Sequence, residues 1–124
     1  MKKLILSLLL LVAGATAMAQ SADDFRAAAE KGDAAAQFQL GQCYEKGLGV
    51  ETDSVQAVKW YTKAADQGNA DALYSLGLCY YYAIGVPENL EKAKAYLRKA
   101  IATGDLDKMK VYTANALMGI FNIH

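Results

Sequence analysis

The sequence of 124 residues predicts an all-α protein made of stacked pairs of helices. Three observations indicate this fold class. Gly32, Gly68 and Gly104 recur every 36 residues, and each is followed by Asp or Asn. The segments 32–67 and 68–103 are identical at 12 of 36 aligned positions, whereas unrelated segments of ordinary composition would share about two or three. Between the glycines, apolar residues recur at steps of three and four, as they do along one face of a helix.

The recurring glycines predict where one helix ends and the next begins. Glycine takes the left-handed backbone conformation that closes a helix, and an Asp or Asn after it accepts hydrogen bonds from the first amides of the next helix. Asp33, Asn69 and Asp105 occupy this capping position. Each junction is therefore expected to join two helices tightly.

The first repeat is expected to hold two antiparallel helices. The first covers about 33–46, because its apolar stripe stops at Gly47. Asp53, with Gln56 three residues later, matches the capping box of a second helix over about 54–67.

The second repeat follows the same plan. It is expected to form helices over about 69–82 and 89–103, with Asn89 in the capping position.

In the first repeat, Ala57 is small enough to lie against Gly41, which predicts that the two helix backbones approach closely.

Single helices are expected at both ends of the array. Residues 23–31 match the second half of a repeat, and Asp105 to about Phe121 supply a last helix in the first-half position. Six helices then form three stacked pairs, about the minimum for an independently stable repeat array. The expected organisation is repeat one over 33–68, repeat two over 69–104 and a C-terminal capping helix over 105–121.

Residues 1–19 have the pattern of a secretory signal peptide. Two lysines precede an apolar run from Leu4 to Val12, and the segment ends in Ala17-Met18-Ala19. The run is shorter than the roughly 20 residues of a membrane-spanning helix, which argues against an uncleaved anchor. We expect cleavage after Ala19, export to the periplasm or beyond, no stable membrane anchor after cleavage, and one domain over 20–124.

The charge balance argues against nucleic acid or anionic lipid as a partner. The chain carries 13 basic and 13 acidic residues, and removal of the two lysines near the N-terminus leaves 11 against 13. The basic residues within 92–99 follow Glu88 and Glu91 on the same expected helix. This arrangement is typical of a solvated helix face.

The strings LGQCYEKGLGV (40–50) and LGLCYYYAIGV (76–86) resemble Sel1-like repeats, which are relatives of tetratricopeptide repeats. Each is followed by a string similar to the rest of that motif, QAVKWYTKAADQG or KAKAYLRKAIATG, so the resemblance covers about 23–104. Departures are Ala83 in place of Gly, Gln56 in place of Lys, and a last helix that does not continue the motif. The resemblance implies a right-handed α-α superhelix of two full repeats flanked by a half repeat at each end.

The resemblance also implies that the concave side, formed by the first helix of each repeat, binds other proteins or peptides. Helical geometry agrees, since Phe38, Gln42 and Glu45 lie opposite the apolar stripe of Ala36, Leu40 and Cys43. We expect the aromatic and leucine side chains to anchor a partner and the charged ones to set its orientation. By position, this face carries Ala35, Phe38, Gln42, Glu45 and Lys46 in repeat one, and Asp71, Tyr74, Leu78, Tyr81 and Tyr82 in repeat two.

Two apolar regions leave alternatives open. Tyr81 and Tyr82 exceed what the repeat requires, so they form a binding surface or pack beneath the terminal helix. That terminal helix carries more apolar residues than one buried stripe needs. It either folds back onto repeat two or mediates homodimerisation or docking to a partner.

Cys43 and Cys79 are expected to be buried free thiols. They occupy the same place in successive repeats, whose neighbouring helices should lie about 8 to 10 Å apart. A disulfide needs Cα atoms about 5.5 Å apart, so the spacing disfavours a bond between them.

No pattern in the chain predicts catalysis, a metal or a cofactor. The sole histidine is His124, the cysteines stand 36 residues apart, and the Gly47 and Gly49 pair lacks the preceding strand of a phosphate loop. Our first hypothesis is an exported, non-enzymatic module that binds an unidentified protein or peptide. The alternative is binding of a small cell-wall ligand, a glycan or muropeptide, on the tyrosine-rich concave face.

Overall fold

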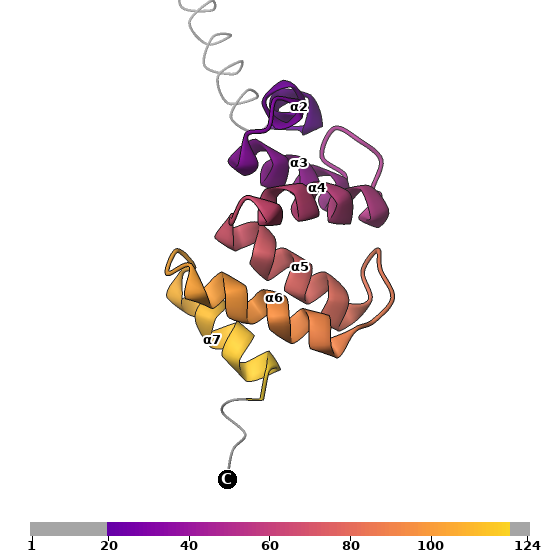
Figure 1. Ribbon diagram of the computed structural model, residues 1–124. Helices are drawn as coiled ribbons and strands as arrows, with labels where there is room; N and C mark the ends of the chain where they lie inside the picture. The colour runs from indigo at the N-terminus through magenta and orange to yellow at the C-terminus, as the bar shows by residue number, and fades with distance from the viewer. Residues whose placement is uncertain (1–19, 120–124) are drawn as a thin grey trace, which may run out of the picture.

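The computed structural model describes residues 20–119, so the expected signal peptide lies outside the described residues. The last helix ends at Leu117, before its expected end at about Phe121. Within this range six helices and no strand form the all-α superhelix that the repeat predicts, and they stack in chain order in Figure 1. None of these helices is long and apolar enough to cross a membrane. Their bounds are α2 (Ala22–Glu30), α3 (Ala34–Lys46), α4 (Ser54–Asp66), α5 (Ala70–Tyr82), α6 (Leu90–Ala102) and α7 (Lys108–Leu117).

Side-chain caps fix the starts of the four helices in the two repeats. Asp33, Asp53, Asn69 and Asn89 each accept a hydrogen bond of 2.9 to 3.1 Å from the backbone N–H three residues later. Such a cap typically contributes about 1 kcal/mol. The boundaries of α3 to α6 accordingly agree with the sequence prediction to within one residue at each end.

The start of the last helix was predicted wrongly. The sequence predicts a helix from Asp105, but α7 spans Lys108–Leu117 and is capped by Asp107, which accepts from the backbone N–H three residues later at 2.9 Å. Asp105 instead donates its own N–H to the Thr103 hydroxyl. Leu106, between the two aspartates, packs against the core. Both aspartates can cap a helix, and the structure uses the second one, which follows the half-buried Leu106.

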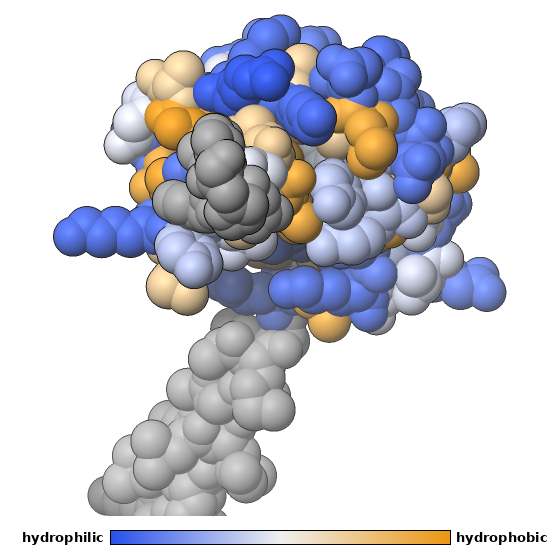
Figure 2. All heavy atoms as spheres, turned by 90° about the horizontal axis from the view of Figure 1, so that it is seen from below, coloured by the Kyte–Doolittle hydropathy of each residue, from blue (hydrophilic) through white to orange (hydrophobic). Residues whose placement is uncertain are grey.

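The end of the stack formed by α7 is partly apolar. α7 lies against α6, as the folding-back alternative requires, and its Val111 and Leu117 are half-buried. Met109 and Tyr112 remain exposed on it. Figure 2, which looks onto this end, shows apolar side chains among polar ones.

Gly41 and Gly77 allow the two helices of each repeat to lie close together. A methyl group on Gly41 would come within 2.6 Å of the Tyr61 ring, and one on Gly77 within 2.6 Å of Leu97. The Ala57 carbonyl oxygen lies 3.2 Å from the same position on Gly41. The predicted approach of Gly41 to the Ala57 turn is therefore confirmed, with the Tyr61 ring filling the remaining space.

In the described part of the chain, the core consists of two clusters that share Tyr44 at their edges. The smaller cluster joins α2, α3 and α4 and includes Leu40 and Trp60, and the larger joins α3 to α6 and includes Tyr61 and Leu76. Burying one large apolar side chain stabilises a fold by about 1.5 to 3 kcal/mol. Because α3 and α4 contribute to both clusters, neighbouring repeats cannot separate without exposing core residues.

Candidate functional site

A groove of about 380 Å³ opens on the face of the molecule formed by α3 and α5. These are the first helices of the two repeats, so the groove lies on the surface that the sequence resemblance implies for binding. The lining residues are Phe38, Gln42, Glu45 and Lys46 of α3, Tyr74, Ser75, Leu78, Cys79 and Tyr82 of α5, Ile84 of the following loop, and Lys110 of α7.

The groove brings together most of the residues named from the sequence. Of the ten residues in that set, Ala35, Asp71 and Tyr81 do not line it. Four lining residues were missed. Ser75 and Cys79 lie next to Tyr74 and Leu78, so helix geometry could have indicated them, whereas Ile84 and Lys110 come from a loop and from another helix. The seven predicted residues that line it are Phe38, Gln42, Glu45, Lys46, Tyr74, Leu78 and Tyr82.

Phe38 differs from the exposed aromatic anchor that the sequence predicts at its position. Its side chain is 8% exposed, and its ring lies against that of Tyr61 with centroids 5.7 Å apart. It belongs to the core cluster that includes Leu73 and Leu76 of the next repeat. Spacing along one helix cannot reveal this burial, because the covering residues belong to other helices, both α4 of the same repeat and α5 of the next. Phe38 therefore forms part of the floor of the groove.

Glu45 is held in place by a hydrogen bond from Tyr61. The Tyr61 hydroxyl donates to Glu45 Oε1 at 2.5 Å. Burial, and then this hydrogen bond, raise the pKa of Tyr61 above its ordinary value, so the hydroxyl stays protonated and remains a donor. The Glu45 carboxylate is thus fixed at the wall of the groove by the fold itself.

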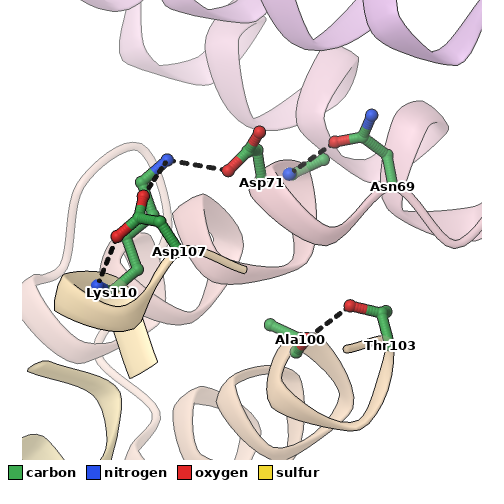
Figure 3. Close-up of polar contacts among 7 residues, drawn as sticks. Asn69, Asp71, Ala100, Thr103, Asp107 and Lys110 are labelled. Atoms are coloured by element: carbon green, nitrogen blue, oxygen red, sulfur yellow. Dashed lines mark hydrogen bonds and ion pairs between the residues drawn. The ribbon is translucent and has the colours of Figure 1, made fainter. Parts of the chain in front are cut away.

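Asp71 acts on the groove through Lys110. Figure 3 shows the Lys110 ammonium between Asp71 and Asp107, 2.7 Å from Asp71 Oδ1 and 3.9 Å from Asp107 Oδ2. The same ammonium lies 5.8 Å from the centroid of the Tyr74 ring. These contacts attach α7 to α5 and place Lys110 at the end of the groove. The charge of Asp71 is satisfied within the chain.

The two neighbouring tyrosines have different surroundings. Tyr82 lines the groove with 57% of its surface exposed, so it is not packed beneath α7. Tyr81 is half-buried, and its ring meets that of Tyr82 edge to face, with centroids 5.0 Å apart and planes inclined by 64°. Tyr81 therefore supports the ring of Tyr82 from outside the groove.

A second hollow of about 230 Å³ adjoins the first across α3. Gln42 and Lys46 line both hollows, so they form the ridge between them. The remaining lining comes from Phe25 of α2 and Leu48 of the loop after α3, together with Gln20, Gln39 and Cys43. The site thus extends beyond the α3 and α5 pair toward the N-terminal helix.

The two cysteines are buried and unpaired, as the repeat spacing predicts. Burial raises the pKa of the Cys79 thiol to about 12 and also raises that of Cys43. A protonated, buried thiol is a weak nucleophile and a weak metal ligand. Among residues 20–119, no group of three or more His, Cys, Asp or Glu side chains is placed to hold a metal ion.

Solved structures with this fold are known from several bacteria. A Sel1 repeat protein from Oxalobacter formigenes is 40% identical, with a TM-score of 0.70 over 81% of this chain and 39% of that one. A protective antigen of uropathogenic Escherichia coli strains with an SLR fold is 35% identical, with a TM-score of 0.63 over 77% of this chain and 24% of that one. The cysteine-rich protein B of Helicobacter pylori is 26% identical, with a TM-score of 0.67 over 74% and 68% of the two chains.

Sequence comparison gives the same assignment. DAP3-binding cell death enhancer 1 of Rattus norvegicus is 54% identical over 39 residues, which make up 32% of this chain and 8% of that protein. The chain therefore spans less than half the length of this relative and of the first two structures. The Sel1 repeat model matches residues 34–69 and 70–105. Because this match covers more than half of the chain, the chain belongs to the Sel1 repeat family.

Proposed function

We propose that this protein binds a segment of another protein in the groove between α3 and α5. Sel1 repeat proteins generally mediate protein–protein interaction. The observation that carries the proposal is the composition of the groove, which combines apolar lining from Phe38, Leu78 and Ile84 with a solvent-exposed rim. Tyr82 stands at this rim, and tyrosine is a frequent interface anchor because it buries a large area with little loss of rotamer entropy.

A peptide fits this surface better than a small sugar ligand does. A glycan or muropeptide would need flat aromatic faces on which to stack. The Tyr74 ring already has the Lys110 ammonium near its face, and the Tyr82 ring is in edge contact with Tyr81. The groove also continues past Gln42 into a second hollow, which suits an extended chain more than a compact ring.

The proposed role is non-enzymatic and requires no cofactor. The Sel1 repeat family is typically a non-catalytic interaction scaffold. Cys79, the thiol that lines the groove, is 3% exposed, and burial raises its pKa to about 12. The groove therefore offers surface complementarity to a partner and no activated thiolate.

The proposal places this interaction in the cell envelope, on the signal-peptide pattern of residues 1–19. N-terminal sequencing of the protein purified from a periplasmic fraction is expected to begin at Gln20. A protein that retains Met1 and stays with the cytosolic fraction would contradict export.

The binding proposal can be tested by affinity capture from an envelope extract, with the wild-type protein and a Leu78→Glu/Tyr82→Ala variant as baits. The matched control is Val55→Ala, since Val55 is 66% exposed on α4 and does not line the groove. We expect the wild type and the control to retain at least one protein that the groove variant loses. Identical sets of proteins on all three baits would contradict binding in the groove. Circular dichroism of each bait verifies that its helices are intact.

A further inference from the structure

We infer that the groove between α3 and α5 accepts a basic side chain of the partner, arginine or lysine, whose charged end pairs with the Glu45 carboxylate. This inference rests on the proposed protein-binding function and specifies the chemistry of the partner. It follows from the position of Glu45, from the apolar lining beside it and from the balance of charges around the groove.

Glu45 presents a fixed acceptor to the groove. Its Oε1 accepts the hydrogen bond from the Tyr61 hydroxyl, and Tyr61 is fully buried in the core, so the carboxylate has a defined position. Burial, and then the charge of Glu45, raise the pKa of the Cys79 thiol to about 12, which places this carboxylate close to α5 on the other side of the groove. Among residues 20–119, no further hydrogen bond or ion pair reaches Glu45, so Oε2 has no donor.

A partner that covers the groove must supply a donor to that oxygen. Glu45 is exposed in the free protein, so water solvates its carboxylate. This water is lost once a partner covers the groove, and a carboxylate left unpaired then costs more free energy than an unpaired neutral group. A guanidinium or ammonium group of the partner replaces the water with a charge-assisted hydrogen bond, which is stronger than one from a neutral donor.

The lysines of the groove do not provide this contact. Lys110 lies 2.7 Å from Asp71 Oδ1 and 3.9 Å from Asp107 Oδ2. Lys46 follows Glu45 directly in α3, and consecutive side chains of a helix point about 100° apart, so the two do not face each other. The groove and the residues that hold Lys110 together carry three carboxylates and two ammonium groups. The excess of one negative charge is complementary to a basic side chain.

The apolar lining suits the stem of the same side chain. Phe38 lies in the floor of the groove, and Leu78 and Ile84 line it beside Glu45. Arginine and lysine bury their methylene stems along apolar surface while the charged end stays at a polar group. A wholly apolar side chain would fill the same space but leave the Glu45 carboxylate unpaired. The groove therefore combines the two surfaces that a long basic side chain needs.

The test begins with a selection of random octapeptides displayed on phage against the immobilised full-length protein. Enriched peptides are expected to share an Arg or Lys at one position. Fluorescence polarisation with one such synthetic peptide should show about a tenfold loss of affinity when this residue is replaced by Gln.

Variants of the protein show whether that residue pairs with Glu45. Glu45→Gln keeps an oxygen for the Tyr61 hydroxyl and removes the charge, and it should lose about tenfold for the original peptide. It should cause no further loss for the peptide with Gln, as a double-mutant cycle requires of two groups in contact. The matched control is Glu91→Gln, an exposed glutamate of α6 outside both hollows, which should leave binding unchanged.

The outcomes separate this inference from the proposed function on which it rests. Peptides that bind and lose affinity in Tyr82→Ala, but lack a basic residue or bind Glu45→Gln as tightly as the wild type, would overturn the inference and leave the binding groove intact. Losses that simply add in the double-mutant cycle would also overturn it. A selection that yields no peptide bound above the blank resin would contradict both.

Discussion

Ala83 adopts a backbone conformation that glycine takes in the preceding repeat. Its φ is 58°, and the equivalent Gly47 has a φ of 74°. A side chain in this left-handed region costs about 1 to 2 kcal/mol, partly offset because alanine restricts the unfolded chain. We expect Ala83→Gly to raise the free energy of unfolding by about 0.5 to 1 kcal/mol, measured by urea denaturation.

The reverse exchange in repeat one is the matched control. A methyl group on Gly47 would come within 2.6 Å of Thr52 Oγ1, in addition to the backbone strain. Gly47→Ala should therefore be destabilising. A variant with Ala83→Gly that unfolds at lower urea than the wild type would show that the loop does not strain Ala83.

Residue burial also predicts how stability depends on pH. The pKa of the Cys79 thiol is raised from 9.0 to about 12, and burial raises that of Tyr61 as well. Both groups stay protonated in the fold but ionise in the unfolded chain above their ordinary pKa values. Unfolding then releases protons, so the free energy of unfolding is expected to fall between about pH 9 and pH 12. Urea midpoints at pH 8 to 11 measure this slope, which should be shallower in Cys79→Ala. An equal slope in that variant would contradict the assignment to Cys79.

At the scale of elements, α7 is attached less firmly than the helices of the repeats. Ala114 is its one buried residue within the described part of the chain, whereas α4 has six. The contact of Lys110 with Asp71 is partly exposed, and such ion pairs contribute at most about 1 kcal/mol. Amide hydrogen exchange is expected to be at least about tenfold faster in α7 than in α4. Equal protection of the two helices would show that α7 is an integral part of the core.

The helices of the repeats could be predicted from the sequence because their signals are local. Caps such as Asp33 and Asn69 act within one turn, so the boundaries of their helices need no knowledge of the fold. The start of α7 could not be predicted, because Asp105 and Asp107 are equivalent as caps and the structure uses the second one.

The candidate site was predictable as a helix face but not in its details. Helical spacing and the family resemblance placed Gln42, Lys46 and Leu78 together, and they line one groove. The burial of Phe38 and the contribution of Lys110 depend on how other helices pack against α3 and α5. Such long-range contacts leave no periodic pattern in the sequence.

At the scale of the whole molecule, two large apolar side chains of the described part of α7 are exposed, which is less than a stable dimer interface needs from this helix. Met109 and Tyr112 are 72% and 62% exposed. A stable interface buries about 800 Å² on each partner, and a large aromatic side chain supplies about 150 to 250 Å². We therefore expect the monomer mass in light scattering at micromolar concentration. A dimer mass that returns to the monomer value in Met109→Ser/Tyr112→Ser would instead support homodimerisation through this helix.

The central claim is that the groove between α3 and α5 is the surface that binds a partner. The most direct test is an NMR titration of the methyl-labelled full-length protein with a peptide from the phage selection. We predict that the methyl signals of Leu78 and Ile84, which line the groove, shift with peptide concentration and saturate. Those of Val55 and Leu90, which are exposed outside it, should stay in place. Saturable shifts confined to Val55 and Leu90, with Leu78 and Ile84 unchanged, would contradict the claim.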